Sequence, residues 1–365
     1  MLETAKKVIN KFCIEGEIVD VKPITTGLIN TTFRVTVNNA GKEIKYTLQT
    51  INKYVFKNPE VVMENIVAVT EFLGNKIKEE GGDAERECLT VIKTKDGLPY
   101  YLDDNGEYWR VYIFIDKSYT VDAVNSPDEL RLAAEGFGKF QAMLADFPMD
   151  KLSETIVGFH NTKARYEQLM AAVEQDAVGR VASVQEEINF LKERYDEMCS
   201  LVKMTEDGIL PLRVVHNDTK FNNILIDEDT NLPLCVIDLD TVMPGLSVMD
   251  FGDAIRFAAN HCGEDETDPS KIYIDMELYE AFAEGFMSKV GKSLTKAEIR
   301  CMPLGAKVIT LEQTSRFLAD YINGDKYFKI KYENHNLDRA RCQMLLAKSM
   351  EENMNKMNEI IEKYL

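Results

Sequence analysis

Several common functional signatures are missing from this sequence. It has seven cysteines but no C-x-x-C pair, and its four histidines are scattered, without H-E-x-x-H or a Cys/His zinc spacing. An odd number of widely spaced cysteines is typical of reduced thiols, which favours a cytoplasmic location over a disulfide-bonded secreted protein. No apolar run reaches about 18 residues, so we expect no membrane-spanning segment. The first residues also lack the apolar core of a signal peptide.

Positive charge is in deficit. The chain has 43 Lys and Arg against 61 Asp and Glu, which gives a formal net charge of −18. Nucleic acids and anionic membranes are bound through clusters of Lys and Arg, so neither is expected as a partner. No obligatory protein partner is inferred either. The P-loop motif G-x4-G-K-[ST] is also absent, so a phosphorylated ligand would need a metal ion or a few placed cations.

The first 115 residues have the pattern of a small β-rich lobe. Apolar residues at helical spacing predict one helix at 58–77, and N-N-A-G-K at 38–42 is a hairpin signal. The last of the strands is apolar on both faces, which is typical of a buried strand. Strands are expected at 29–37, 42–51, 89–92, 98–102 and 107–115.

The rest of the chain has mainly helical periodicity. One strand-like stretch, within 212–240, interrupts the helices and carries many polar residues. The predicted helices lie at 126–144, 185–202, 276–290, 306–322 and 337–365. We therefore expect a bilobal α+β protein, with a small β-rich N-lobe at 1–115 and a large, mainly helical C-lobe at 116–365.

The polar stretch contains H-N-D-x4-N, formed by His216, Asn217, Asp218 and Asn223. Phosphoryl transfer needs a carboxylate to accept the proton of an alcohol and oxygen ligands to hold Mg²⁺ on nucleotide phosphates. An Asp with an Asn five residues later is the spacing of a kinase catalytic loop. A second carboxylate is expected after the next strand, where Asp238 stands. A decorated turn is the plainer alternative, because Asn and Asp favour turns.

A literal D-F-G, the metal motif of protein kinases, occurs at 250–252. We do not assign Asp250 as the metal ligand, because Asp238 follows Asn223 after a simple hairpin, whereas Asp250 would require a looped-out segment. We expect Asp250 to cap the helix that follows it. Asp240 would point to the same side as Asp238 if the strand continued, as a second ligand or a sugar contact.

Nucleotide-binding residues are expected in the N-lobe. The hydroxyl-rich turn before residue 33 offers Thr26 and Thr32 as donors, and Gly27 permits close approach to phosphate. The strand that ends at Phe114 and Ile115 would be the hinge whose backbone binds the adenine edge. These residues predict ATP as the phosphoryl donor.

The motifs H-N-D-x4-N and V-I-D-L-D resemble the aminoglycoside phosphotransferase and choline kinase superfamily, which has a protein-kinase-like fold. Within it, G-L-I-N-T-T-F, I-D-L-D-T-V-M-P-G and R-F-L-A-D-Y-I-N-G-D-K-Y-F resemble the N-acetylhexosamine 1-kinases, over about residues 8 to 350. The resemblance implies an ATP- and Mg²⁺-dependent transfer to the anomeric hydroxyl of N-acetylglucosamine or N-acetylgalactosamine.

The resemblance also implies residue roles. Asp218 would be the catalytic base and contact the sugar, Asn223 and Asp238 would hold Mg²⁺, and Arg316 and Tyr327 would contact the sugar. Two positions depart from wider patterns. Gln49 stands where protein kinases have the phosphate-binding Lys, and relatives of this subgroup share that Gln. Leu28 stands where a family member has His, which puts contacts of the phosphate loop in doubt.

Other acceptors remain open at this stage. The same chemistry could act on an aminoglycoside, choline, homoserine or methylthioribose. A choline site needs an aromatic cage, and the chain has a single Trp. A non-catalytic nucleotide-binding regulator is a further alternative, against which the complete set Asp218, Asn223 and Asp238 argues.

Overall fold

The structure is a computed structural model that describes residues 2–24, 29–121 and 126–365. The chain forms two compact units, and each is built from several segments. Unit 1 comprises Met1–Thr120, Met143–Val157 and Asn222–Pro244. Unit 2 comprises Val121–Ala142, Gly158–Phe221 and Gly245–Leu365. The expected lobes 1–115 and 116–365 stay a prediction; the units found here are discontinuous because two later segments group with the N-terminal part.

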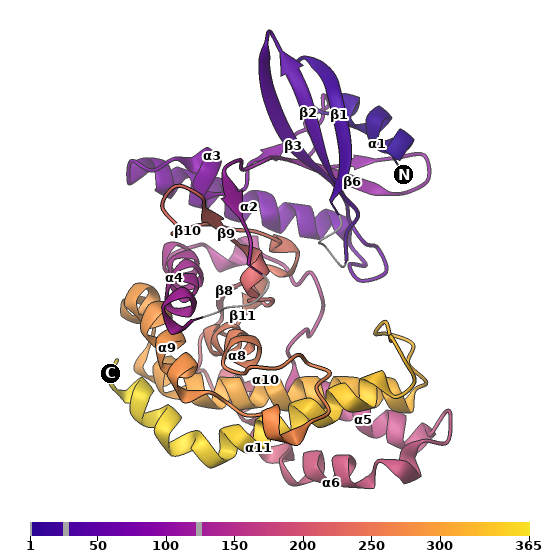
Figure 1. Ribbon diagram of the computed structural model, residues 1–365, viewed down its shortest axis with the longest axis vertical. Coiled ribbons are helices and arrows are strands. Elements are labelled where there is room, and N and C mark those ends of the chain that lie inside the picture. Colours follow the sequence, from indigo (N-terminus) through magenta and orange to yellow (C-terminus); the bar gives the residue numbers. More distant parts are fainter. Residues whose placement is uncertain (1, 25–28, 122–125) are drawn as a thin grey trace. The chain divides into compact units, whose positions relative to one another are not determined.

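Unit 1 is built on an antiparallel sheet in the order β1-β2-β3-β6-β4, with β5 also paired to β6 (Figure 1). The strands are β1 (Glu17–Ile24), β2 (Thr32–Asn39), β3 (Lys42–Thr50), β4 (Val91–Ile92), β5 (Tyr101–Leu102) and β6 (Tyr108–Ile113). The β2–β3 hairpin turns through Ala40 and Gly41, which both have positive φ, as the N-N-A-G-K signal predicts. Val35 and Val37 are fully buried and alternate with more polar neighbours.

Three helices accompany this sheet: α1 (Leu2–Val8), α2 (Pro59–Glu79) and α3 (Ala84–Glu87). The stripe predicted for the helix at 58–77 is confirmed, because Val62, Ile66 and Val69 are fully buried. One face of the sheet packs with α1 into a continuous apolar core that includes Phe12, Leu48, Trp109 and Val111. Burial of this apolar surface is the main stabilising contribution to unit 1.

A second, small sheet of unit 1 carries the polar stretch of the sequence. Its order is β10-β9-β7, with β7 (Ser118–Tyr119), β9 (Ile224–Asp227) and β10 (Pro233–Val236). The predicted hairpin is confirmed: β9 and β10 are antiparallel, and Val236 lies opposite Ile224. The pairing continues one step further, since the Ile237 amide donates to the Asn223 carbonyl at 2.9 Å.

Unit 2 is mainly helical (Figure 1). The remaining helices of the chain are α4 (Pro127–Met143), α5 (Thr162–Gln175), α6 (Gln185–Glu193), α7 (Tyr195–Glu206), α8 (Ser247–Ala258), α9 (Met276–Val290), α10 (Lys296–Ile322) and α11 (His335–Glu362). Two short strands, β8 (Arg213–Val215) and β11 (Met243–Gly245), complete the chain. The long helices α10 and α11 lie side by side and pack with α5, α6 and α7 around Leu191, Leu311 and Leu318. The predicted α+β class is confirmed.

Two helix predictions need correction. The helix predicted at 185–202 is broken at Arg194, whose guanidinium binds the Glu351 carboxylate at 2.6 and 2.9 Å and the Phe190 carbonyl at 3.0 Å. The helix predicted at 306–322 begins earlier, at Lys296, because Thr295 and Glu298 form a capping box. None of the helices in the described ranges is long and apolar enough to cross a membrane.

Candidate active site

A single buried carboxylate in unit 2 holds the loop that carries Asp218. The backbone amides of His216 and Asn217 donate to the two oxygens of Asp250, each at 2.7 Å. The Thr219 hydroxyl donates to the Asp250 backbone carbonyl at 2.7 Å. Asn217 has a φ of 62°, in the left-handed region that Asn tolerates better than most residues. Asp250 therefore holds the backbone just before Asp218 and the Thr219 side chain just after it.

Asp250 is itself fixed by α4 and α8. Its carboxylate accepts a hydrogen bond from Gln141 Nε2 at 2.6 Å, and the Ser247 hydroxyl donates to Gln141. Burial raises the pKa of Asp250, although the nearby His216 and the amide donors act in the opposite direction. The helix α8 begins at Ser247, so Asp250 lies inside its first turn. The expectation that Asp250 caps a following helix is wrong, because its carboxylate binds the loop at 216–217 instead.

The other two residues of D-F-G have packing roles. Phe251 is fully buried and lies edge-on to the rings of Phe282 and Phe286, at centroid distances of 5.4 and 5.6 Å. A Cβ on Gly252 would lie 2.6 Å from the backbone carbonyl of Gly305, so α8 and α10 approach each other closely here. The motif is thus explained by support of the Asp218 loop and by helix packing within unit 2.

Asp218 has a cationic neighbour in the same loop. Its Oδ1 lies 2.6 Å from Lys220 Nζ, and the Asp218 side chain is 22% exposed. Burial opposes the charge of Lys220, but the carboxylates of Asp218 and Asp253 outweigh it and raise the pKa of this lysine. The ring of His216 accepts a hydrogen bond from the Asp218 amide at 3.3 Å. Asp218 is therefore partly accessible within a well-fixed loop, as a proton-accepting carboxylate requires.

The two predicted metal ligands both belong to unit 1. Asn223 precedes β9 and Asp238 follows β10, and the hydrogen bond from Ile237 to Asn223 brings their backbones together. Asp238 is exposed and has φ 59° and ψ 54°, so the strand ends before it. One carboxylate and one carboxamide form an oxygen donor set suited to Mg²⁺, which takes few protein ligands and completes its shell with phosphates and water. Within the described residues, no three His, Cys, Asp or Glu side chains are grouped as a metal site.

Asp240 does not continue the strand from Asp238. It lies in the 3-10 helix η5 (Leu239–Thr241) and is buried, with 3% exposure. One of its oxygens pairs with Arg110 Nη1, and the other accepts from Asn30 Nδ2 at 2.7 Å. The left-handed conformation of Asp238 turns the chain and sends the Asp240 side chain toward β6. Its predicted sugar contact stays a prediction.

Arg110 is the residue that sequence reasoning missed. Its Nε donates to Gln49 Oε1 at 3.1 Å, and Gln49 Nε2 donates to the Thr32 hydroxyl at 3.0 Å. Burial opposes the charge of Arg110, but Asp240 and, more weakly, Asp238 outweigh it and raise its pKa. A cation thus lies beside Gln49, on the neighbouring strand. An Arg within the otherwise apolar run at 107–115 was the signal available in the sequence.

The other predicted ATP contacts are only partly within the described residues. Thr26 and Gly27, together with Leu28, lie outside them. The amide of Phe114 donates to the Lys45 carbonyl at 3.0 Å, and the carbonyl of Ile115 accepts from the Ser118 hydroxyl at 2.8 Å. The adenine contact of this segment stays a prediction.

Two of the predicted sugar-binding residues, Arg316 and Tyr327, lie near each other in unit 2. The guanidinium of Arg316 is 5.6 Å from the ring of Phe328, and the ring of Tyr327 is 4.8 Å from that same ring. Asp320 holds this segment by accepting hydrogen bonds from the amides of Tyr327 and Phe328 at 2.8 and 2.9 Å. The Tyr327 side chain is about half exposed. Tyr327 is therefore not a core residue, and its predicted sugar contact stays a prediction.

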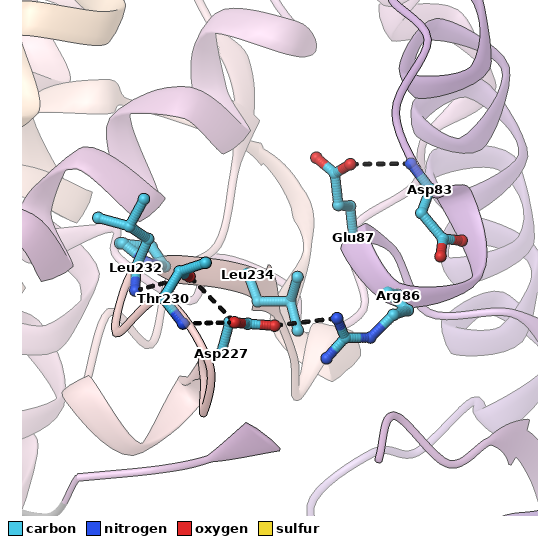
Figure 2. Close-up of a pocket in the computed structure, with 8 residues that line it drawn as sticks. Asp83, Arg86, Glu87, Asp227, Thr230, Leu232 and Leu234 are labelled. Atoms are coloured by element: carbon cyan, nitrogen blue, oxygen red, sulfur yellow. Dashed lines mark hydrogen bonds and ion pairs between the residues drawn. The ribbon is translucent and has the colours of Figure 1, made fainter. Parts of the chain in front are cut away.

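A surface pocket of about 280 Å³ lies elsewhere in unit 1, between α3 and the β9–β10 hairpin. Figure 2 shows that Arg86 reaches across it to Asp227, and their charged groups are 2.9 Å apart. Asp227 also accepts from the amide and hydroxyl of Thr230 at 2.8 and 3.0 Å. None of the predicted site residues lines this pocket. Its polar groups already pair with each other, so we do not assign it to the active site.

Comparison with solved structures supports the predicted fold. An aminoglycoside phosphotransferase from Alicyclobacillus acidocaldarius has a TM-score of 0.61 at 13% identity, covering 98% of this chain and 96% of that one. A choline kinase from Cryptosporidium parvum has a TM-score of 0.54 at 16% identity, covering 94% and 92%. A spectinomycin phosphotransferase, solved with ADP and spectinomycin, has a TM-score of 0.54 at 12% identity, covering 100% and 98%. At these identities the similarity establishes the fold alone, and the predicted aminoglycoside phosphotransferase-like fold is confirmed.

The sequence itself matches the model of one protein family. The model describes the phosphotransferase enzyme family, abbreviated APH, and it matches residues 20–286, which is more than half of the chain. This range includes the Asp218 loop, the β9–β10 hairpin and Asp250. The chain therefore belongs to the APH phosphotransferase enzyme family.

Proposed function

We propose that this phosphotransferase transfers the terminal phosphoryl group of ATP to the anomeric hydroxyl of N-acetylglucosamine or N-acetylgalactosamine. Family membership supports the reaction type. The observation that carries the proposal is the Asp218 loop, in which Asp250 accepts hydrogen bonds from the two backbone amides that precede Asp218. The choice of acceptor rests on the sequence blocks shared with N-acetylhexosamine 1-kinases. We also propose that the enzyme acts in the cytoplasm.

Asp218 is the proposed catalytic base. Its carboxylate would accept the proton of the sugar 1-hydroxyl while that oxygen attacks the phosphorus in line. The short spacing of H-N-D-x4-N keeps Asp218 close in the chain to Asn223, which together with Asp238 would hold Mg²⁺. When bound, Mg²⁺ would neutralise negative charge on the nucleotide phosphates. The other proposed nucleotide contacts are Thr26, Gly27, Thr32, Gln49, Phe114 and Ile115.

Arg316 and Tyr327 are the proposed sugar contacts. Both side chains lie near the Phe328 ring, which supports a shared ligand, because a guanidinium and a phenol offer hydrogen bonds next to an aromatic surface. Asp240 has both carboxylate oxygens bound by Arg110 and Asn30. We therefore place the main sugar contacts on Arg316 and Tyr327.

The test is ADP release with Mg-ATP against a panel of acceptors. The panel contains both N-acetylhexosamines, glucose, galactose, choline, homoserine, methylthioribose and kanamycin, and phosphorus NMR identifies the phosphorylated position. We expect turnover on the N-acetylhexosamines with phosphate on C1. Turnover only on another alcohol would retain the kinase reaction and discard the proposed acceptor. Binding of Mg-ATP without turnover of any acceptor would favour a regulator.

The same assay tests the base. Asp218→Asn should lower the turnover number roughly a hundredfold to ten-thousandfold, the usual contribution of a general base. Nucleotide binding should change little. Asp229→Asn is a matched control, because Asp229 is an exposed residue in the turn between β9 and β10. If Asp218→Asn keeps more than about a tenth of the turnover, another group accepts the proton.

A further inference from the structure

A histidine and a glutamate form a buried pair in unit 2 that the reaction scheme above does not use. His160 Nδ1 lies 3.0 Å from Glu312 Oε1. Glu312 is fully buried in the middle of α10, one turn before Arg316, and Arg316 Nη1 is 4.0 Å from the same carboxylate oxygen. The pair therefore adjoins one of the two proposed sugar contacts.

Each partner has a second polar atom with unmet hydrogen-bonding capacity. Within the part of the chain that the structure describes, His160 Nε2 and Glu312 Oε2 are buried and have no hydrogen-bond partner. Only four side-chain atoms in that part have this property, and two of them belong to this one pair. Buried polar groups almost always have partners, and exceptions occur where a protein binds a ligand or water. The arrangement thus indicates a site for a polar molecule.

The charges of the pair define what this site can bind. Burial opposes the charged imidazolium of His160, but the Glu312 carboxylate outweighs it and raises the pKa of His160. Burial likewise opposes ionisation of Glu312, but His160, Arg316 and Arg165 outweigh it and lower the pKa of this carboxyl group. The pair consequently presents an N–H donor on His160 next to a carboxylate acceptor on Glu312.

The surroundings favour an uncharged ligand. Arg316 and Arg165 both act on the Glu312 carboxylate, and Arg316 also lies 5.5 Å from the Phe159 ring, so two guanidinium groups lie near the pair. These cations oppose binding of a cationic acceptor such as choline or an aminoglycoside. A donor beside an acceptor, bordered by aromatic rings, matches the alternating hydroxyl and amide groups of a neutral sugar.

The pair is also linked electrostatically to the Asp218 loop. The Asp253 carboxylate contributes to the raised pKa of His160 and to that of Lys220, the ion-pair partner of Asp218. One carboxylate of unit 2, that of Asp253, therefore acts on both His160 and Lys220.

We propose that His160 and Glu312 bind hydroxyl or amide groups of an uncharged acceptor sugar, and that they thereby determine acceptor specificity. This inference rests on the proposed function, because it assigns the recognition of the sugar that is phosphorylated. His160 and Glu312 are substrate-binding residues in this assignment and take no part in proton transfer.

The test compares Glu312→Gln and His160→Gln with the wild-type enzyme. Glu187→Gln is the matched control, since Glu187 is also a buried glutamate of unit 2 paired with a cation, Arg341 Nε at 2.7 Å. Calorimetry measures the Kd of each N-acetylhexosamine in the presence of Mg²⁺ and a non-hydrolysable ATP analogue. We expect the Kd to rise about 10- to 100-fold in both site variants, as for a lost hydrogen bond to a charged group. The KM for ATP and all values for Glu187→Gln should stay close to wild type.

Deoxy analogues of the sugar separate binding from a merely structural role. For the wild-type enzyme, a deoxy sugar that lacks the hydroxyl bound by Glu312 should have a Kd about tenfold or more above that of the complete sugar. For the Glu312→Gln variant, the same deoxy sugar should have nearly the same Kd as the complete sugar, because the side chain that binds this hydroxyl is already altered. If Glu312→Gln does not fold, by circular dichroism, the same cycle with His160→Gln decides.

The outcomes distinguish this inference from the proposed function. Wild-type turnover on N-acetylhexosamines with an unchanged Kd in both site variants would overturn the inference alone. The inference would also be overturned if every deoxy analogue raised the Kd of a folded site variant by the same factor as it raised the Kd of the wild type. Turnover only on choline or kanamycin would overturn both the inference and the proposed acceptor.

Discussion

Asp250→Asn is the substitution that best tests whether the D-F-G aspartate supports the Asp218 loop or binds the metal ion. In the wild type, one carboxylate accepts three N–H donors, from the amides of His216 and Asn217 and from the side chain of Gln141, at 2.6 to 2.7 Å. An asparagine has one acceptor oxygen, and its NH₂ group would face at least one of these donors. At least one hydrogen bond to a charged acceptor is lost and a buried donor is left unpaired.

The loss should lower stability by about 2 to 3 kcal/mol, since a hydrogen bond to a charged group contributes roughly 1.5 to 3 kcal/mol. For a chain of this size the melting temperature should fall by roughly 3 to 4 °C. The stabilisation of the protein by Mg-ATP should remain, because Asp250 is not a metal ligand in our assignment. Differential scanning fluorimetry with and without Mg-ATP measures both quantities.

Asp238→Asn is the matched control with the opposite expectation. Asp238 is exposed and has a left-handed backbone conformation that Asn tolerates, so the melting temperature without ligand should be unchanged. The Mg-ATP shift should be lost or greatly reduced. A wild-type melting temperature together with a lost Mg-ATP shift in Asp250→Asn would refute our reasoning and make Asp250 the metal ligand.

Two further predictions concern stability within single units. Arg110→Met should destabilise unit 1 by about 3 to 5 kcal/mol, because the buried Asp240 would lose its cation. The double variant Arg110→Met/Asp240→Asn should recover part of this loss of stability. Equal melting temperatures for the single and double variants would contradict this prediction. Gly305→Ala should cost about 1 to 3 kcal/mol, since its Cβ would lie 2.2 Å from the Val248 carbonyl. Gly74→Ala, whose Cβ would be 3.9 Å from its nearest neighbour, is the control, and thermal unfolding measures both.

Local patterns in the sequence were sufficient for much of the secondary structure. The N-N-A-G-K signal placed the β2–β3 hairpin, and the spacing of Val62, Ile66 and Val69 placed α2, because these features depend on neighbouring residues. The β9–β10 hairpin followed in the same way. The break at Arg194 was not predictable from periodicity, and the side chain at the break binds Glu351, which is 157 residues away in the chain.

For the candidate site, the sequence by itself determined which residue types stand at which spacing: H-N-D-x4-N and a second Asp beyond the next strand. Only the tertiary structure decided which carboxylates have structural roles. Asp250 binds amides 33 and 34 positions away, and Asp240 pairs with an arginine 130 positions away. Side-chain periodicity reports the face on which a residue lies, but a buried charge is stabilised by whichever partner the fold brings near it. His160 and Glu312, 152 positions apart, became a pair for the same reason.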